Sequence, residues 1–224
     1  MHISKLTIRN YKNFLNSSLD FHKGVNTIIG ENGSGKTNIM QAIRILLDEN
    51  LPRTYRFYES DFNRSLKPWK GHWIIIQLFF DDLDHGDEAQ ALTLHQLGDA
   101  EPDTSKGSCA VIFRPKYLTR KSLYELSIDE HKTSEKLAEI VDAISVDDYE
   151  ILYTSKSSVD FSENSAYKKY VGDFKKIIFP DPSDLAQNIY GSKLYVANLT
   201  KEVSCTFVKA LRDVEADLRS YRDN

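Results

Sequence analysis

The chain has 224 residues, of which 41% are hydrophobic and 28% are charged, and its formal net charge is −4. This length suits one large domain, or one domain with an inserted subdomain, and the composition is that of an ordinary globular protein. The slightly negative charge excludes nucleic-acid binding that relies on an overall positive charge, so any DNA contact must come from a local patch or from residues outside the chain.

Cysteine usage and hydropathy indicate the compartment. Only two cysteines occur, Cys109 and Cys205, far apart and without metal-ligand spacing, which favours a reduced, intracellular setting. The longest apolar block, Trp73–Phe80, is strand-sized and contains Gln77, and the N-terminus alternates polar and apolar residues. We therefore expect no signal peptide, no membrane span and a cytoplasmic location.

In chain order, the first elements are a hairpin, a strand and a helix. Strands are expected at Ile3–Ile8 and Leu15–Phe21, paired through a turn at Asn10–Asn13. Val25–Ile29 is a short apolar run that predicts a buried strand leading into a glycine-rich loop. Thr37–Asp48 has apolar residues at helical spacing, which predicts a helix with one apolar face.

The middle of the chain predicts a small antiparallel sheet. Residues 50–72 are rich in basic and aromatic side chains and carry little periodicity. Residues 81–106 are expected to form a surface loop, with or without a short helix. Ser155–Ser165 is expected to be a polar connection. The remaining expected elements are strands at Trp73–Phe80, Cys109–Phe113, Ser122–Ile128, Tyr149–Tyr153, Lys176–Phe179 and Lys193–Ala197, and a helix at Glu135–Ile144.

The last segment has the spacing of a helix that packs along one seam. Apolar residues recur there at alternating intervals of four and three residues. The pattern fits either the start of a longer helical arm or a helix that packs on the domain itself. The residues concerned are Phe207, Leu211, Val214, Leu218 and Tyr221.

Residues 30–37 carry the chemistry that the sequence shows most directly. They match the pattern G-x-x-x-x-G-K-[ST] in full, between an apolar run and an amphipathic helix, as a phosphate-binding loop requires. Glycines let backbone amides face a phosphate, and the following helix adds the positive end of its dipole. Lys36 is expected to reach the β- and γ-phosphates of ATP, and the Thr37 hydroxyl to ligate Mg²⁺. The expected nucleotide-binding residues of this loop are Gly30, Glu31, Asn32, Gly33, Ser34, Gly35, Lys36, Thr37 and Asn38.

Hydrolysis also needs carboxylates that support Mg²⁺ and orient the attacking water. The sequence contains two apolar runs that end in aspartate, at Asp81 and, after an intervening proline, at Asp181. Asp81 would make the chain a self-contained ATPase. The alternative, which we favour, is that its strand belongs to the accessory sheet and ends in a solvated acidic turn. The catalytic set is therefore expected to be incomplete.

A second sequence match includes the loop and a segment before it. Ile8–Phe14 (IRNYKNF), a strand, and then Ile28–Asn38 (IIGENGSGKTN) resemble the beginning of ABC-type ATPases of the SMC, RecF and OLD proteins. Leu46–Asp48 followed by Tyr58–Phe62 (YESDF) most resembles OLD-family (overcoming lysogenization defect) nucleases, including those of Gabija-type anti-phage systems.

The resemblance implies an α/β fold, a P-loop NTPase of ABC type with a mixed sheet and an accessory antiparallel β-subdomain. It implies an ATPase head over residues 1–200, without signature or clear Walker B, and a helical arm or dimerisation segment that starts at 201–224. By the same analogy Lys12 is expected near the nucleotide, and Gln77 is a weaker candidate for a Q-loop glutamine. The implied partners are DNA through the full assembly, a second copy of the chain and a second defence-system subunit.

Three further clusters of charged residues are candidates for function. The basic and aromatic residues of 53–70 suit DNA phosphates and bases, but we favour a solvated loop with its aromatic rings packed on the domain. The acidic clusters 81–87 and 147–150 lack the setting of a nuclease metal site and are expected to be solvated turns. The six histidines show no zinc spacing.

Taken together, the sequence predicts the ATP-binding front portion of an OLD-family DNA endonuclease, with nuclease residues outside the chain. Three alternatives remain: an SMC- or RecF-like repair ATPase without a nuclease, a short regulatory subunit that supplies Walker A to a partner, and the small ATPase that uses Asp81.

Overall fold

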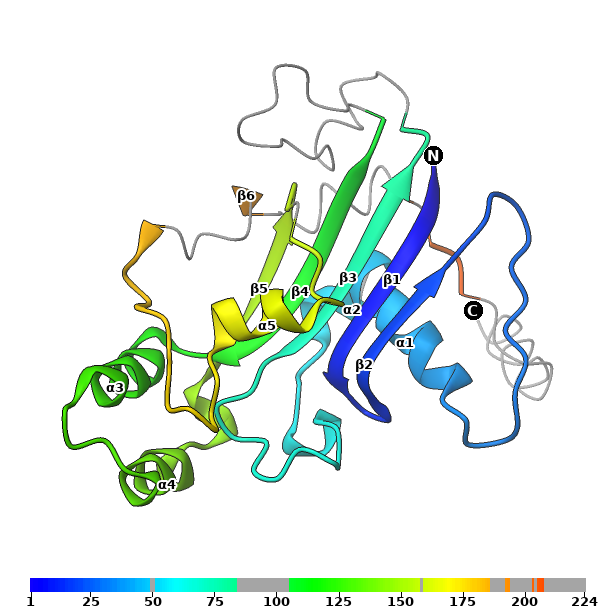
Figure 1. Ribbon diagram of the computed structural model, residues 1–224. Helices are drawn as coiled ribbons and strands as arrows, with labels where there is room; N and C mark the ends of the chain where they lie inside the picture. Colours follow the sequence, from blue (N-terminus) through cyan, green and yellow to red (C-terminus); the bar gives the residue numbers. More distant parts are fainter. Residues whose placement is uncertain are drawn as a thin grey trace.

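A computed structural model describes residues 1–48, 51–83, 105–157, 159–185, 192–193, 203 and 205–207. Its centre is one six-stranded sheet in the order β2-β1-β3-β4-β5-β6, in which every described pair of neighbours is antiparallel. Figure 1 shows the sheet with α1 and α2 behind it and α5 in front. The strands are β1 (His2–Tyr11), β2 (Phe14–Asp20), β3 (Ile74–Asp81), β4 (Gly107–Pro115), β5 (Tyr149–Ser155) and β6 (Ser192–Lys193). The helices are α1 (Lys36–Leu47), α2 (Leu51–Thr54), α3 (Tyr117–Ile128), α4 (Ser134–Ala143) and α5 (Asn164–Val171).

The two faces of the sheet bury different side chains because successive residues of a strand point to opposite faces. On β3, Ile74, Ile76 and Leu78 pack in the larger core with α1, whereas Ile75 packs with the residues under α5. Covering on both faces explains why the central strands are apolar without alternation, as an interior strand requires. The hairpin, the helix after the loop and the strands predicted within β3, β4 and β5 are confirmed. The expectation that the strand ending at Asp81 belongs to a separate accessory sheet is wrong, because β3 pairs directly with β1 in the same sheet as the hairpin.

The face under α5 contains a polar network. The Arg9 guanidinium lies 4.4 Å from the centre of the Tyr167 ring and donates to Asn164 Oδ1. Gln77 is fully buried, and its Nε2 donates to Val159 O at 2.8 Å. The side chain of Gln77 therefore holds the segment before α5 against the sheet by a hydrogen bond. This structural role accounts for a polar residue in this strand.

Two strand predictions are wrong. Residues 122–128 belong to the helix α3, because Leu123 and Leu126, three residues apart, pack on one side against Ile177 and Phe179. Residues 176–179 form a turn with one isolated bridge between Asp173 and Ile178. The helix α5 was not predicted, and it begins in the last residues of the polar connection expected at 155–165.

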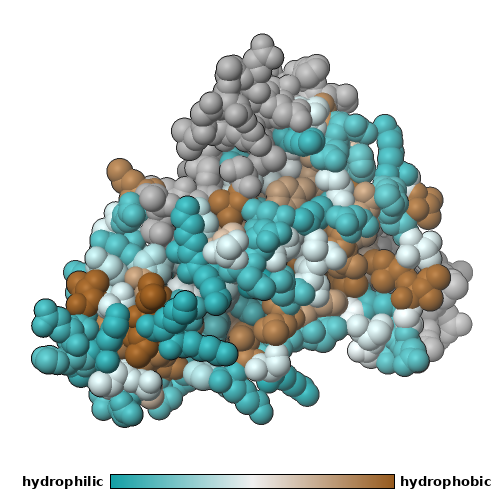
Figure 2. Space-filling model, in the orientation of Figure 1, coloured by the Kyte–Doolittle hydropathy of each residue, from teal (hydrophilic) through white to brown (hydrophobic). Residues whose placement is uncertain are grey.

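The expected buried strand at Val25–Ile29 is also wrong for this structure. The segment has no strand assignment, and Val25 and Ile29 are 96% and 89% exposed. Hydrophobic side chains gather at the right of Figure 2, where Figure 1 places the segment between β2 and α1. Among the described residues no neighbouring strand pairs with this run; Val25 and Ile29 face solvent, whereas Ile28 is partly buried against the larger core.

Several predictions fall outside the described residues. The loop predicted at 81–106 is described only at 81–83 and 105–106, and of the strand predicted at 193–197 only Lys193 is described. The arm expected at 201–224 is described only at 203 and 205–207. Of the described helices, none is both long and apolar enough to cross a membrane.

Candidate nucleotide-binding site

The predicted phosphate loop, residues 30–37, follows the segment Val25–Ile29, which pairs with no described strand, and leads directly into α1. Gly33 and Gly35 have φ angles of 84° and 103°, which L-residues with a side chain rarely adopt. A Cβ atom at Gly35 would overlap the side-chain amide of Asn13. The backbone angle therefore favours glycine at this position, and any other residue would also have to displace the Asn13 side-chain amide. Residues 30–34 and Thr37 are exposed, Lys36 and Asn38 are half-buried, and Gly35 is buried.

The N-terminus of α1 is arranged to receive an anion. Its N-cap residue, Gly35, provides no side-chain hydrogen bond, and the first turn contains no acidic residue. The first backbone N–H groups of the helix and the positive end of its dipole are therefore not matched by a local carboxylate. This arrangement fits a phosphate group.

Lys36 and Thr37 lie at the start of the helix, as the sequence predicts. The Lys36 ammonium donates to Gly30 O at 2.5 Å and to Glu31 O at 2.7 Å, so it closes the loop on itself. A triphosphate would compete with these two carbonyl groups for the ammonium. The Thr37 side chain is exposed at the second helical position, where a hydroxyl is accessible to Mg²⁺.

The turn between β1 and β2 touches the loop, and its contacting residue was missed by the sequence analysis. Asn13 Nδ2 donates to Ser34 O at 3.1 Å, and Asn38 Nδ2 donates to Asn13 Oδ1 at 2.8 Å. The neighbouring Lys12 forms an ion pair with Asp61, with 2.5 Å between Nζ and Oδ1. The predicted contact between Lys12 and nucleotide stays a prediction, and it would require Lys12 to share its charge with Asp61.

The strand register places Asp81 far from the loop. Asp81 pairs with His2 at the start of β1, whereas the turn that contacts the loop follows Tyr11 at the other end of that strand. Nine residue steps of a strand correspond to about 30 Å. The structure therefore contradicts the self-contained ATPase that uses Asp81. Asp181, the other candidate, accepts hydrogen bonds from Ser183 N and Oγ in a local turn.

The aromatic residues between α2 and β3 are mostly part of the core. Phe57 stacks on Phe113 at 5.0 Å between ring centres, and Phe62 stacks on Trp69 at 4.7 Å. Tyr58, in contrast, is 63% exposed. Packing of these rings on the domain, the alternative that the sequence analysis favoured, is thus what the structure shows for Phe57 and Phe62.

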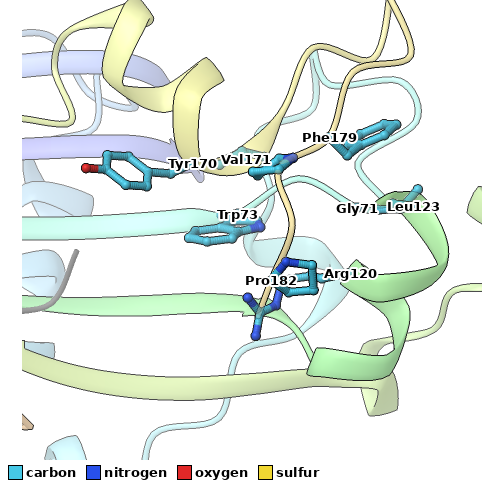
Figure 3. A pocket seen from close by; sticks show the side chains of 9 residues that line it. Gly71, Trp73, Arg120, Leu123, Tyr170, Val171, Phe179 and Pro182 are labelled. Carbon is cyan, nitrogen blue, oxygen red and sulfur yellow. The ribbon is translucent and has the colours of Figure 1, made fainter. Parts of the chain in front are cut away.

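Two hollows lie away from the loop. A groove of ≈ 860 Å³ has buried aromatic residues in its floor, and its rim carries Arg56 as well as the acidic residues Glu59 and Asp147. The second, shown in Figure 3, is only ≈ 10 Å³, about the space of one water molecule, and lies among the segment just before β3, α3, α5 and residues 179–182. Neither hollow includes a residue of the loop.

No candidate metal cluster of three or more histidine, cysteine, aspartate or glutamate residues occurs in the part of the chain that the structure describes. Asp148 accepts from Ser145 N and Oγ in a local turn, and Glu150 pairs with Arg114 at 2.9 Å. These contacts give the acidic cluster at 147–150 structural roles. The cluster predicted at 81–87 is described only as far as 83.

Comparison with known proteins agrees with this geometry. The family model described as "AAA ATPase domain" matches residues 1–202. The chain belongs to this family. The prediction of an α/β, ABC-type P-loop NTPase fold is confirmed.

Curated relatives of this AAA ATPase domain are DNA replication and repair proteins RecF. Those of Geobacillus thermodenitrificans and Geobacillus kaustophilus are 46% identical over 54 residues, 24% of the chain and 14% of each relative. The RecF protein of Oceanobacillus iheyensis is 46% identical over 56 residues, which are 25% of the chain and 15% of that relative. The matched stretch therefore spans about a seventh of the length of these relatives.

A solved structure from work on ATP-driven dimerization and DNA-stimulated activation of SMC ATPases was also matched. It aligns over the full length of both chains with 16% identity and a TM-score of 0.38.

Proposed function

We propose that the AAA ATPase domain of this chain binds MgATP at residues 30–38. The observation that supports this most directly is the N-terminus of α1, which lacks both a side-chain cap and an acidic first turn and follows a loop with two left-handed glycines. In the proposed complex the amides of 33–36 hold the β-phosphate, Lys36 leaves the loop carbonyls to bind phosphate oxygens, and Thr37 ligates Mg²⁺.

The test is nucleotide affinity measured by isothermal titration calorimetry. Lys36→Ala is expected to abolish tight MgATP binding, because it removes the one cation held in the loop. The matched control is Lys23→Ala, an exposed lysine in the preceding segment whose nearest acidic partner is Asp82 at 3.4 Å. Unchanged affinity in Lys36→Ala, or an equal loss in both variants, contradicts the proposal.

We further propose that hydrolysis needs residues supplied from elsewhere, either from more polypeptide or from a second ATPase head. Two features support this: Asp81 lies about 30 Å along the sheet from the turn that contacts the loop, and the loop itself is open to solvent. The unpaired run Val25–Ile29 next to the loop, in which Val25 and Ile29 are exposed, is a segment that a further strand could pair with. A homodimer that encloses ATP between two heads fits these features.

The finer proposal is that this domain is the front portion of an OLD-family ATP-dependent DNA endonuclease of the cytoplasm, used in anti-phage defence with a second subunit. It rests on the resemblance of Leu46–Asp48 and Tyr58–Phe62 to those nucleases. The alternative is a RecF-like DNA repair ATPase, which the similarity to RecF proteins favours. The mass and sequence of the native protein discriminate between them: a Toprim-type glutamate and Asp-x-Asp pair supports the nuclease, and their absence rules it out.

If the domain contacts DNA itself, the exposed cations Arg64 and Lys67 are the candidates for contact with phosphates. Phe57 and Phe62 are too buried to stack on bases. Reversing both charges is expected to weaken DNA binding and to reduce the slope of log affinity against log salt by about 1 to 2. The control reverses the exposed pair Lys175–Lys176. An unchanged slope in the Arg64 and Lys67 variant argues against this contact.

A further inference from the structure

The turn between β1 and β2 is hydrogen-bonded to residues 61–63. Asn10 and Lys12 have φ angles of 58° and 52°, a conformation that needs support from neighbouring groups. That support comes from the end of a short 3₁₀ helix, Glu59–Asp61, and the residues after it: Lys12 N donates to Asp61 O at 2.6 Å, and Asn63 N donates to Asn10 O at 2.9 Å. Asn63 Nδ2 also donates to Lys12 O at 2.9 Å. The turn is thereby tied to a part of the chain about 50 residues away in sequence.

Asn13, the residue that leaves this turn, extends its side chain to the loop. Its amide makes two hydrogen bonds of defined direction, because Nδ2 can only donate and Oδ1 can only accept. Nδ2 donates to Ser34 O, while Oδ1 accepts from Asn38 Nδ2. The contact with Asn38, in the first turn of α1, thus holds the amide in the orientation that aims Nδ2 at Ser34.

The direction of the Ser34 carbonyl determines the direction of the next backbone N–H. The peptide bond between Ser34 and Gly35 is planar and trans, so its C=O and N–H groups point to opposite sides. Asn13 holds the C=O toward the turn, and the Gly35 N–H therefore points away from the turn. Glycine alone would leave this peptide plane free to rotate, because Gly35 has access to an unusually wide range of φ and ψ.

We propose that Asn13 is a positioning residue for phosphate binding, acting through Ser34 O to orient the Gly35 amide toward the phosphate. This inference rests on the proposed binding of MgATP at the same loop. Asn13 itself touches no phosphate in this proposal. Its contribution is to present the amide already oriented, so that binding does not have to order it.

The test compares Asn13→Ala with Asn38→Ala and with the control Asn16→Ala. Asn16 is an exposed asparagine on the same hairpin whose Nδ2 donates instead to Ser162 O at 3.0 Å. Three quantities are measured for each: MgATP affinity by calorimetry, melting temperature without nucleotide, and the ¹H–¹⁵N resonance of the Gly35 amide on addition of magnesium pyrophosphate.

Asn13→Ala is expected to lower MgATP affinity about 5- to 30-fold, the equivalent of the two neutral hydrogen bonds that it removes. Asn38→Ala is expected to cause a smaller loss, and Asn16→Ala none. Asn13→Ala and Asn38→Ala should both keep the melting temperature of the wild type. The shift of the Gly35 amide resonance caused by pyrophosphate should be smaller in Asn13→Ala.

The outcomes separate this inference from the function on which it rests. If the wild-type chain binds no MgATP, the proposed function fails and the inference falls with it. If the wild type binds and Asn13→Ala binds as well as Asn16→Ala, only the role of Asn13 is overturned. A loss that comes with a lower melting temperature, and is absent from Asn38→Ala, shows a purely structural role and also overturns the inference.

Discussion

Replacement of Gly35 by alanine tests the loop geometry most directly. The residue has a φ angle of 103°, and an added Cβ would overlap the Asn13 side-chain amide. The backbone angle alone costs an L-residue about 1–3 kcal/mol. Displacing Asn13 also removes its hydrogen bonds to Ser34 and Asn38, at about 1 kcal/mol each.

The sum is about 3–5 kcal/mol against the loop conformation that the structure shows, which corresponds to a loss of MgATP affinity of roughly 100-fold or more. The loop is exposed apart from Gly35 and the half-buried Lys36, so we expect it to rearrange without unfolding the sheet. Calorimetric titration with MgATP, together with thermal unfolding in the absence of nucleotide, measures both effects separately.

A double-mutant cycle separates the cost of the backbone angle at Gly35 from the cost of displacing the Asn13 side chain. In a chain that already carries Asn13→Ala, the substitution Gly35→Ala meets no side-chain amide and should cost only the backbone strain. We therefore expect Gly35→Ala to be less damaging in that background by about 1–2 kcal/mol, or roughly 5- to 30-fold in affinity. Wild-type affinity in Gly35→Ala would refute the reasoning, because nucleotide would then bind a different loop conformation.

Three further predictions concern the scaffold. Tyr167→Phe should destabilise the fold by about 1–3 kcal/mol in denaturant unfolding, since the hydroxyl that meets Asn10 Nδ2 at 2.7 Å and the Trp73 N–H at 3.2 Å is lost; an unchanged midpoint contradicts this. Burial lowers the pKa of His72 from 6.5 to about 4, so the unfolded chain takes up a proton that the folded chain does not. Stability should therefore fall as the pH drops from about 6.5 toward 4, and His72→Gln should flatten that slope; an equal slope in both proteins argues against it. Asp81→Ala should leave any ATP hydrolysis by the native protein within about twofold of the wild type, because of its distance from the loop, and abolished turnover would restore Asp81 as a metal-supporting residue.

Local patterns were enough to predict the elements whose hydrogen bonds form within or next to their own segment. The hairpin of β1 and β2, the phosphate loop and α1 all depend on turn residues, glycines and helical spacing that are adjacent in sequence. The loop motif also indicated phosphate binding, because its glycines and Lys36 together suit a phosphate group.

Alternation of polar and apolar residues misled where a tertiary partner decides between strand and helix. Residues 122–128 fit a strand by pattern, but Leu123 and Leu126 find their apolar partners, Ile177 and Phe179, on one side of a helix. Val25–Ile29 has the composition of a buried strand, yet a strand exists only when a neighbour accepts its backbone hydrogen bonds. No such neighbour lies among the described residues.

What the sequence determined by itself is therefore the presence of a phosphate loop and the type of ligand that suits it. The tertiary structure decided which distant residues support that loop: the turn of β1 and β2 brings Asn13 to Ser34, and the register of β3 takes Asp81 to the opposite end of the sheet. The physical reason is that a glycine-rich loop specifies its own backbone angles locally, whereas the side chains around it are set by strand pairing between segments tens of residues apart.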